Sequence, residues 1–201
     1  QVQAIFGRPD TRLFPPPGPR RADTYFAHTT DPEVKAPRIY QGLAVQGRSP
    51  REALRKAWVS LMSAAQDLYM LNGGYKSENP ADPYMTTLGY FSSLRELGGC
   101  RRVLEEEVQN YLKSYGRRNA PDQERIFRDR KSWNEVVELT SRVSTGDVAK
   151  AKQRLETDFT HKKERVDAAL ATNMISVGLD IPRLGLMVVN GQPKSHSEYI
   201  Q

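Results

Sequence analysis

The chain has 201 residues, of which 38% are hydrophobic and 27% are charged, so it can form one well-packed globular core. No apolar run approaches the roughly 20 residues of a membrane-spanning helix, and no signal peptide is recognisable, so we do not expect a membrane protein. The net charge of +6 favours polyanionic partners, with nucleic acid as the first candidate. The single cysteine, Cys100, cannot form an internal disulfide, which favours a reducing cytoplasm, and its thiol is expected to be a buried, idle group.

The first part of the chain, residues 1–37, is predicted to be a loop-rich connecting segment. The sequence FPPPGP at 14–19 imposes an extended, polyproline-like course, as in a stiff connection between domains. Two short strands are expected at 24–28 and 38–45. A single domain over residues 38–201 is the simplest division of the rest.

Helical and strand patterns alternate in this second part. A helix start is predicted by Ser49, Pro50 and Glu52. From there an apolar stripe continues at helical spacing to about residue 70. This stripe, which includes Trp58, is assigned to core packing. The later elements are expected as a strand at 84–91, a helix from 94 to about 115, a strand at 135–143, a helix from 144 to about 159, and strands near 166–172 and 185–190. This order predicts an α/β fold with a mainly parallel sheet flanked by helices.

Small and polar residues follow the predicted strands, where an α/β sheet places its binding sites. The most informative of these segments is ATNMISVGLDIP at 171–182, which lies between two apolar runs. Hydroxyl and amide groups there can contact sugar phosphates, and a glycine lets a ligand approach the backbone closely. The residues in question are Ser92, Ser141, Arg142, Thr172, Asn173, Ser176, Gly178 and Asp180. For Asp180, a turn residue before Pro182 is a serious alternative.

A complete active site is not expected within the chain. The sequence lacks a Gly-rich cradle ending in Gly-Lys-Ser/Thr with an acid that holds magnesium, and it lacks paired Cys/His spacing for a metal. Ser195, His196 and Glu198 suggest a hydrolase triad, but triad groups normally come from separated elements. We therefore predict no catalytic residue and no metal ligand.

Basic residues outnumber acidic ones between Lys113 and Lys131. This run is compatible with a phosphate-binding surface, and equally with a solvated helix face or a disordered connection.

Several motifs resemble those of superfamily two DNA helicases and follow the helicase order. GYFSSLRELGG at 89–99 looks like motif IV, and ELTSRVSTGDVAKAKQRLETDF at 138–159 resembles the strand and helix before motif V. ATNMISVGLDIP resembles motif V itself, and GQPKSHSEYIQ at 191–201 resembles the lead-in to motif VI. Together with FPPPGP, the sequences of these motifs resemble those of the DrmA helicases of the DISARM anti-phage defence systems.

The resemblance implies a RecA-like fold, in which residues 1–37 are the tail of a first motor lobe with a Pro-rich interlobe connection. Residues 38–201 would be the second RecA-like lobe, truncated before motif VI. Such motors hydrolyse ATP with Mg²⁺ between two lobes and move on, or remodel, DNA. The cofactors ATP and Mg²⁺ would be bound mainly by parts outside this chain, so the fragment alone is predicted to be inactive.

The same resemblance implies roles for individual residues. Gly178 and Asp180 would lie at the nucleotide cleft, and Thr172 would contact the nucleic-acid backbone. Ser92, Ser141 and Arg142 would line the DNA groove. A companion defence subunit, DrmB-like, is the expected protein partner. The alternative function is a non-catalytic nucleic-acid-binding or scaffold module that retains a degenerate RecA-like fold.

Overall fold

The computed structural model describes residues 2–7, 20, 28–76, 78–172 and 181–193. The chain divides into two units, Gln1–Ala44 and Val45–Gln201. In the first unit, the described residues form a short helix, α1 (Val2–Phe6), and an exposed stretch over 28–44 without a regular helix or strand.

The predicted strand at 38–45 is wrong. These residues have no regular structure, and Ile39 is 83% exposed. A strand does not form here because no described strand lies beside these residues to complete their backbone hydrogen bonds. The strand expected at 24–28 lies almost entirely outside the described residues. The assignment of the first 37 residues to a motor-lobe tail stays a prediction.

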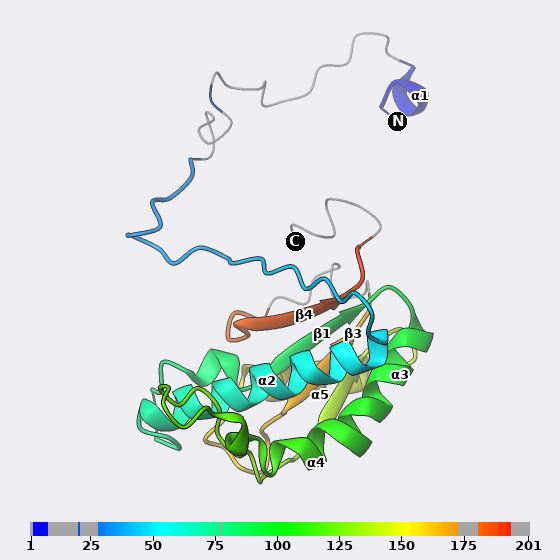
Figure 1. The fold of residues 1–201 in the computed structure, drawn as a ribbon. Helices are drawn as coiled ribbons and strands as arrows, with labels where there is room; N and C mark the ends of the chain where they lie inside the picture. Colours follow the sequence, from blue (N-terminus) through cyan, green and yellow to red (C-terminus); the bar gives the residue numbers. More distant parts are fainter. Residues whose placement is uncertain (1, 8–19, 21–27, 77, 173–180, 194–201) are drawn as a thin grey trace. The chain divides into compact units, whose positions relative to one another are not determined.

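The second unit is built on a four-stranded sheet whose neighbouring strands are all parallel (Figure 1). The order is β2 (Val136–Leu139), β3 (Ala168–Ala171), β1 (Thr87–Phe91) and β4 (Leu186–Asn190). The predicted α/β, RecA-like class is therefore confirmed. β1 and β3 are buried along their full length, as expected for central strands covered on both faces.

Two helical layers cover the sheet because alternate strand residues face opposite sides. On one face, α2 (Pro50–Leu71) and α3 (Leu94–Val103) pack through Trp58 and Leu97 against Phe91 and Leu170. On the other face, α5 (Thr145–Glu156) packs through Leu155 against Leu88, Leu139 and Ala169. The core assignment of Trp58 is confirmed, since the side chain is fully buried.

The helices begin where their capping residues predict. The hydroxyl oxygens of Ser49, Ser93 and Ser144 accept from the amides of Glu52, Glu96 and Asp147 at 3.2, 3.3 and 3.2 Å. The helix expected from 94 to about 115 is less regular than its apolar spacing suggested. After α3 come a π-helical turn, η2 (Leu104–Val108), then α4 (Gln109–Leu112) and a 3-10 turn, η3 (Tyr115–Arg118).

Two strands are shorter than expected. The strand at 84–91 begins only at Thr87, because Asp82–Tyr84 forms a 3-10 turn, η1, that contains Pro83. The strand at 135–143 ends at Leu139, because the carbonyl of Thr140 turns back to accept from the amide of Val143 at 3.1 Å.

Gly89 explains how α2 approaches the sheet so closely. A Cβ atom at this position would lie 2.9 Å from Leu170 Cδ2, from Phe91 Cε2 and from Trp58 Cζ2. The indole of Trp58 thus occupies the space that a side chain on the central strand would fill.

Cys100 is buried in the core, at 1% exposure, and burial raises the pKa of its thiol to about 12. Because the thiolate is the reactive form, the native protein is expected not to react with an aromatic disulfide reagent at neutral pH. In guanidinium chloride, which unfolds the chain, one thiol per chain should react with the reagent, and Cys100→Ala serves as the blank. Stoichiometric reaction of the native protein within minutes would contradict this burial.

Among the described residues, no helix is long and apolar enough to cross a lipid bilayer.

Candidate nucleic-acid interface at the carboxyl ends of the strands

The parallel sheet gathers the predicted strand-end residues at one edge. Tyr90 on β1 and Leu139 on β2 are both in register with Ala171 on the intervening strand β3. The residues that follow each of them therefore lie side by side, with Thr172 in the middle. Figure 1 shows the same edge at the arrowheads of the strands.

Thr172 directly follows the last residue of β3 at this edge and is only 6% exposed. Strand alternation places it on the same face as Leu170, which is the face covered by α2 and α3. Its backbone is thus held by a buried strand, which limits the positions available to its hydroxyl.

Ser92 and Ser93 form the turn between β1 and α3, and the two have different tasks. Ser93 caps α3, whereas Ser92 is exposed and makes no side-chain hydrogen bond within the described part of the chain. Ser92 is therefore the hydroxyl of this turn that is available to a ligand.

Ser141 and Arg142 are exposed in the turn after β2, and Thr140 holds that turn. The buried Thr140 hydroxyl donates to Glu138 Oε1 at 2.7 Å and accepts from the amide of Arg142 at 3.3 Å. Glu138 in turn is paired with Arg101 on α3, at 3.5 Å. The chain after β2 thus presents a hydroxyl and a guanidinium from an anchored backbone.

Carboxylates occupy the first turns of both helices at this edge. The hydrogen bond from Ser144, followed by the charge of Lys150, lowers the pKa of Asp147 at the start of α5, so this group stays ionised at neutral pH. Glu96 takes the corresponding place in α3. Because carboxylates already complement the helix dipoles, the groups at this edge that are suited to contact a phosphate are the hydroxyls and Arg142.

The remaining predicted residues, Asn173, Ser176, Gly178 and Asp180, lie outside the described residues, as do Ser195, His196 and Glu198. The structure therefore brings together Ser92, Ser141, Arg142 and Thr172 at one edge. The roles assigned to all eight site residues stay predictions.

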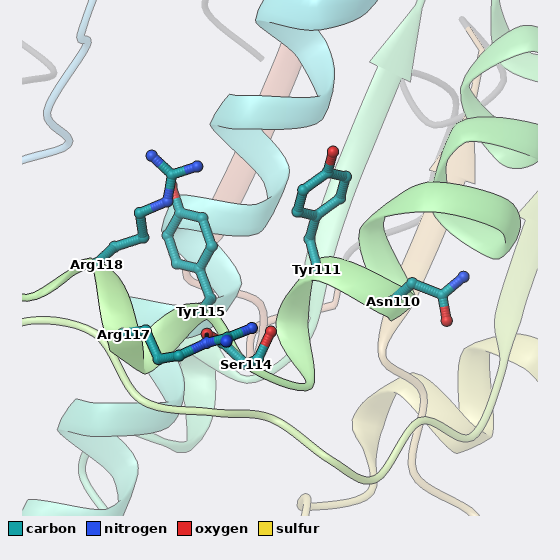
Figure 2. Close-up of a pocket in the computed structure, with 6 residues that line it drawn as sticks. All are labelled: Asn110, Tyr111, Ser114, Tyr115, Arg117 and Arg118. Atoms are coloured by element: carbon teal, nitrogen blue, oxygen red, sulfur yellow. Dashed lines mark hydrogen bonds between the residues drawn. The ribbon is translucent and has the colours of Figure 1, made fainter.

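The basic run at 113–131 separates into paired and unpaired cations. The Nε atoms of Arg125 and Arg128 both lie 3.0 Å from Oδ1 of the buried Asp67, and Arg130 pairs with the buried Asp167. Within the part of the chain that the structure describes, Lys113, Arg117, Arg118 and Lys131 have no ion-pair partner. Arg117 and Arg118 line a surface hollow beside α4 (Figure 2).

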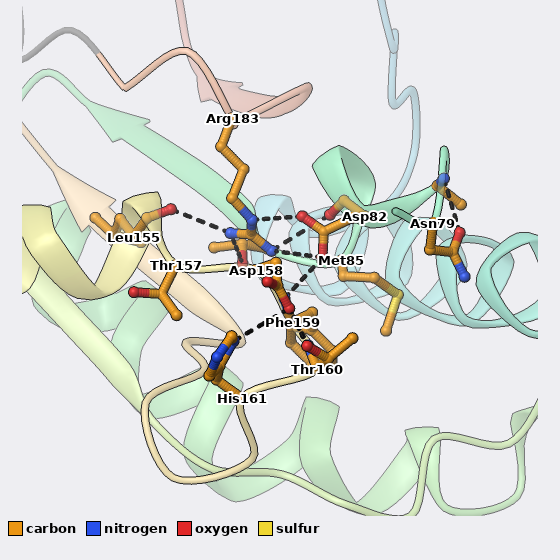
Figure 3. Close-up of polar contacts among 12 residues, drawn as sticks. Asn79, Asp82, Met85, Leu155, Thr157, Asp158, Phe159, Thr160, His161 and Arg183 are labelled. Carbon is orange, nitrogen blue, oxygen red and sulfur yellow. Dashed lines mark hydrogen bonds and ion pairs between the residues drawn. The ribbon is translucent and has the colours of Figure 1, made fainter. Parts of the chain in front are cut away.

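Arg183 was not anticipated from the sequence, yet it anchors the far end of the motif-V-like segment (Figure 3). Its guanidinium pairs with Asp82 at 2.5 Å and donates to Thr86 Oγ1 at 3.1 Å and to the Leu155 carbonyl at 3.2 Å. Asp82 also accepts from the amide of Phe159 at 2.7 Å. Asp82 and Thr86 precede β1 and Leu155 lies in the last turn of α5, so Arg183 lies at the amino ends of the strands, opposite Thr172.

Thr172 and Arg183, which flank residues 173–182 in the sequence, are thus both held by residues of the folded unit. No local signal could have indicated this, because Asp82 and Arg183 are 101 positions apart in the sequence.

Among the described residues, no group of three or more His, Cys, Asp or Glu side chains could hold a metal ion.

No protein-family model matches the chain. The DISARM protein DrmA of Bacillus paralicheniformis is 39% identical over all 201 residues. The chain spans 17% of the length of that protein. The resemblance that the motifs indicated is therefore confirmed along the whole chain.

Proposed function

We propose that this chain, similar along its entire length to a DrmA protein, is part of an ATP-dependent DNA helicase or translocase of a bacterial anti-phage defence system. Within that protein it would bind DNA and contribute one side of the ATP cleft. The observation that carries the proposal is the strand edge at which Ser92, Thr172, and Ser141 with Arg142 meet from three parallel strands. Hydroxyls and a guanidinium on anchored turns suit the sugar-phosphate backbone of DNA.

The nucleotide side of the proposal assigns Gly178 and Asp180 to the ATP cleft. They belong to the segment between Thr172 and Arg183, two residues that lie at opposite ends of the sheet. Its place in the sequence, directly after the proposed DNA contact Thr172, suits a role in coupling nucleotide binding to that contact. ATP and Mg²⁺ would be bound mainly by parts of the protein outside this chain, and a companion defence subunit would be its partner.

The central test is DNA-stimulated ATP hydrolysis by the full-length protein, with and without its companion subunit. Hydrolysis that rises on addition of DNA supports the motor. DNA binding without any hydrolysis would replace the motor by the non-catalytic nucleic-acid-binding module.

Thr172→Val tests the strand edge, because it removes the hydroxyl and keeps the shape of the buried side chain. A hydrogen bond to a charged phosphate contributes about 1.5–3 kcal/mol, so the DNA concentration for half-maximal stimulation should rise roughly tenfold or more. Thr172→Ser keeps the hydroxyl and should stay near the wild type. Equal DNA stimulation of the valine variant and the wild type would count against the role of Thr172.

A further inference from the structure

The hollow beside α4 has a volume of about 390 Å³ and combines guanidinium groups with aromatic rings (Figure 2). Its lining residues are Asn110, Tyr111, Ser114, Tyr115, Arg117 and Arg118. Arg130 links the end of α4 to the start of β1, because its amide donates to the Leu112 carbonyl and its guanidinium donates to the Met85 carbonyl. The hollow beside α4 therefore lies toward the amino ends of the strands. The hollow is therefore separate from the strand-end residues described above.

The charge of the hollow is positive. Arg117 and Arg118 are exposed, and the ammonium of Lys113 donates to Asn110 Oδ1 at 3.0 Å beside them. The sequence holds no acidic residue between Gln109 and Pro121. The carboxylate of Asp129 accepts from the amide of Gly116 at 2.7 Å and makes no ion pair with these cations.

The turn that carries the two arginines is fastened from behind. The side-chain amide of Asn119 donates to the carbonyls of Gly116 and Phe127 at 2.6 and 2.7 Å. Its oxygen accepts from the amides of Ile126 and Phe127, both at 2.9 Å. Because the backbone is held in place, binding a ligand costs less ordering entropy than it would on a free loop.

Two tyrosines supply the aromatic surface. The Tyr115 ring is positioned by its hydroxyl, 3.0 Å from Ser60 Oγ, and by edge contact with Phe127 at 5.1 Å between centroids. Tyr111 is 44% exposed, and the guanidinium of Arg55 lies 4.5 Å above its ring. A large aromatic side chain that is oriented on one side and exposed on another is suited to stack against a planar ligand.

We propose that this hollow is a second nucleic-acid site, which binds a single-stranded segment through phosphates on Arg117 and Arg118 and through a base stacked on Tyr111. Cations beside aromatic faces are the combination that single-stranded nucleic acid requires, since each nucleotide presents one phosphate and one π-face. An acidic peptide would use the cations alone. The proposal rests on DNA as the ligand in the proposed function, and it is independent of ATP hydrolysis.

The test is fluorescence anisotropy with a fluorescein-labelled oligothymidylate and the full-length protein, at several salt concentrations. The double variant R117A/R118A should bind roughly tenfold more weakly, and its slope of log affinity against log salt should fall by about 1.4, at about 0.7 per lost phosphate contact. Tyr111→Ala should weaken binding roughly five- to hundredfold with an unchanged slope, and Tyr111→Phe should restore it. Thermal unfolding followed by circular dichroism verifies that each variant is folded.

The matched control is K162A/K163A, which removes the same charge from an exposed adjacent pair outside the hollow. If R117A/R118A weakens binding no more than this control, the proposal is overturned. The same holds if the variants weaken duplex and single-stranded binding equally, or if they release the companion subunit while DNA binding stays intact.

Thr172→Val, measured in parallel, separates the two proposals. A loss of affinity with Thr172→Val but not with the hollow variants overturns the second site alone. No DNA binding by the wild-type protein overturns both.

Discussion

Replacing Asp167 with alanine is expected to lower the free energy of unfolding by about 3–5 kcal/mol, because it leaves a buried arginine without its counter-ion. Asp167 and Arg130 have side-chain exposures of 0% and 1%. The Asp167 carboxylate also accepts from the amides of Asn134 and Glu135 at 2.6 and 3.3 Å, just before β2. The substitution therefore breaks an ion pair and also removes the acceptor for two backbone groups at the start of a strand.

Denaturant unfolding followed by circular dichroism measures this loss. Asp122→Ala removes an exposed carboxylate and should change the stability by no more than about 0.5 kcal/mol. The double variant R130M/D167N removes both charges and keeps an amide oxygen for the two backbone donors, so it should recover part of the loss. If Asp167→Ala were as mild as the Asp122 control, the pair would not stabilise the fold in this way.

The second large effect is expected for Trp58→Ala, which should lower the free energy of unfolding by about 3–5 kcal/mol because it opens a cavity in the core. The indole fills the space over Gly89 and belongs to the same cluster as Phe91, Leu97 and Leu170.

Trp58→Phe is the control variant, because it keeps an aromatic ring and removes only part of the side-chain volume. The buried indole Nε1 has no hydrogen-bond partner among the described residues, so phenylalanine gives up no hydrogen bond there and should cost less than about 1.5 kcal/mol. Circular dichroism is the suitable probe, because both variants remove a fluorescent tryptophan. A loss with phenylalanine as large as the loss with alanine would contradict the assignment of the effect to the size of the cavity.

Much of the fold could be predicted from local sequence patterns. The caps at Ser49, Ser93 and Ser144 set the helix starts, and the alternation of strands and helices predicted the parallel sheet. Strand and helix ends were less accurate, at the 3-10 turn before β1 and at the π-helical turn after α3, because backbone turns there depend on neighbouring elements. The exposed stretch at 38–45 shows that a strand-like pattern without a pairing partner does not form a strand.

The candidate site was predictable only in part, because local patterns do not show contacts between distant positions. That Ser92, Ser141, Arg142 and Thr172 follow strands is visible in the sequence, and parallel strands place such residues at one edge. The anchoring of the motif-V-like segment by Arg183 and Asp82 was not visible, since a contact between distant positions leaves no periodic signal.

The sequence by itself determined the element types, the parallel arrangement of the sheet and the resemblance to DrmA, because each depends on short-range patterns or on motif wording. Only the tertiary structure decided which cations of the basic run are available to a ligand. Asp67 and Asp167 lie 61 and 37 positions from the arginines Arg128 and Arg130 that they neutralise. The sequence does not distinguish the cations of this run from one another. In the folded chain, the buried carboxylates of Asp67 and Asp167 pair with some of them, and Arg117 and Arg118 remain exposed beside Tyr111.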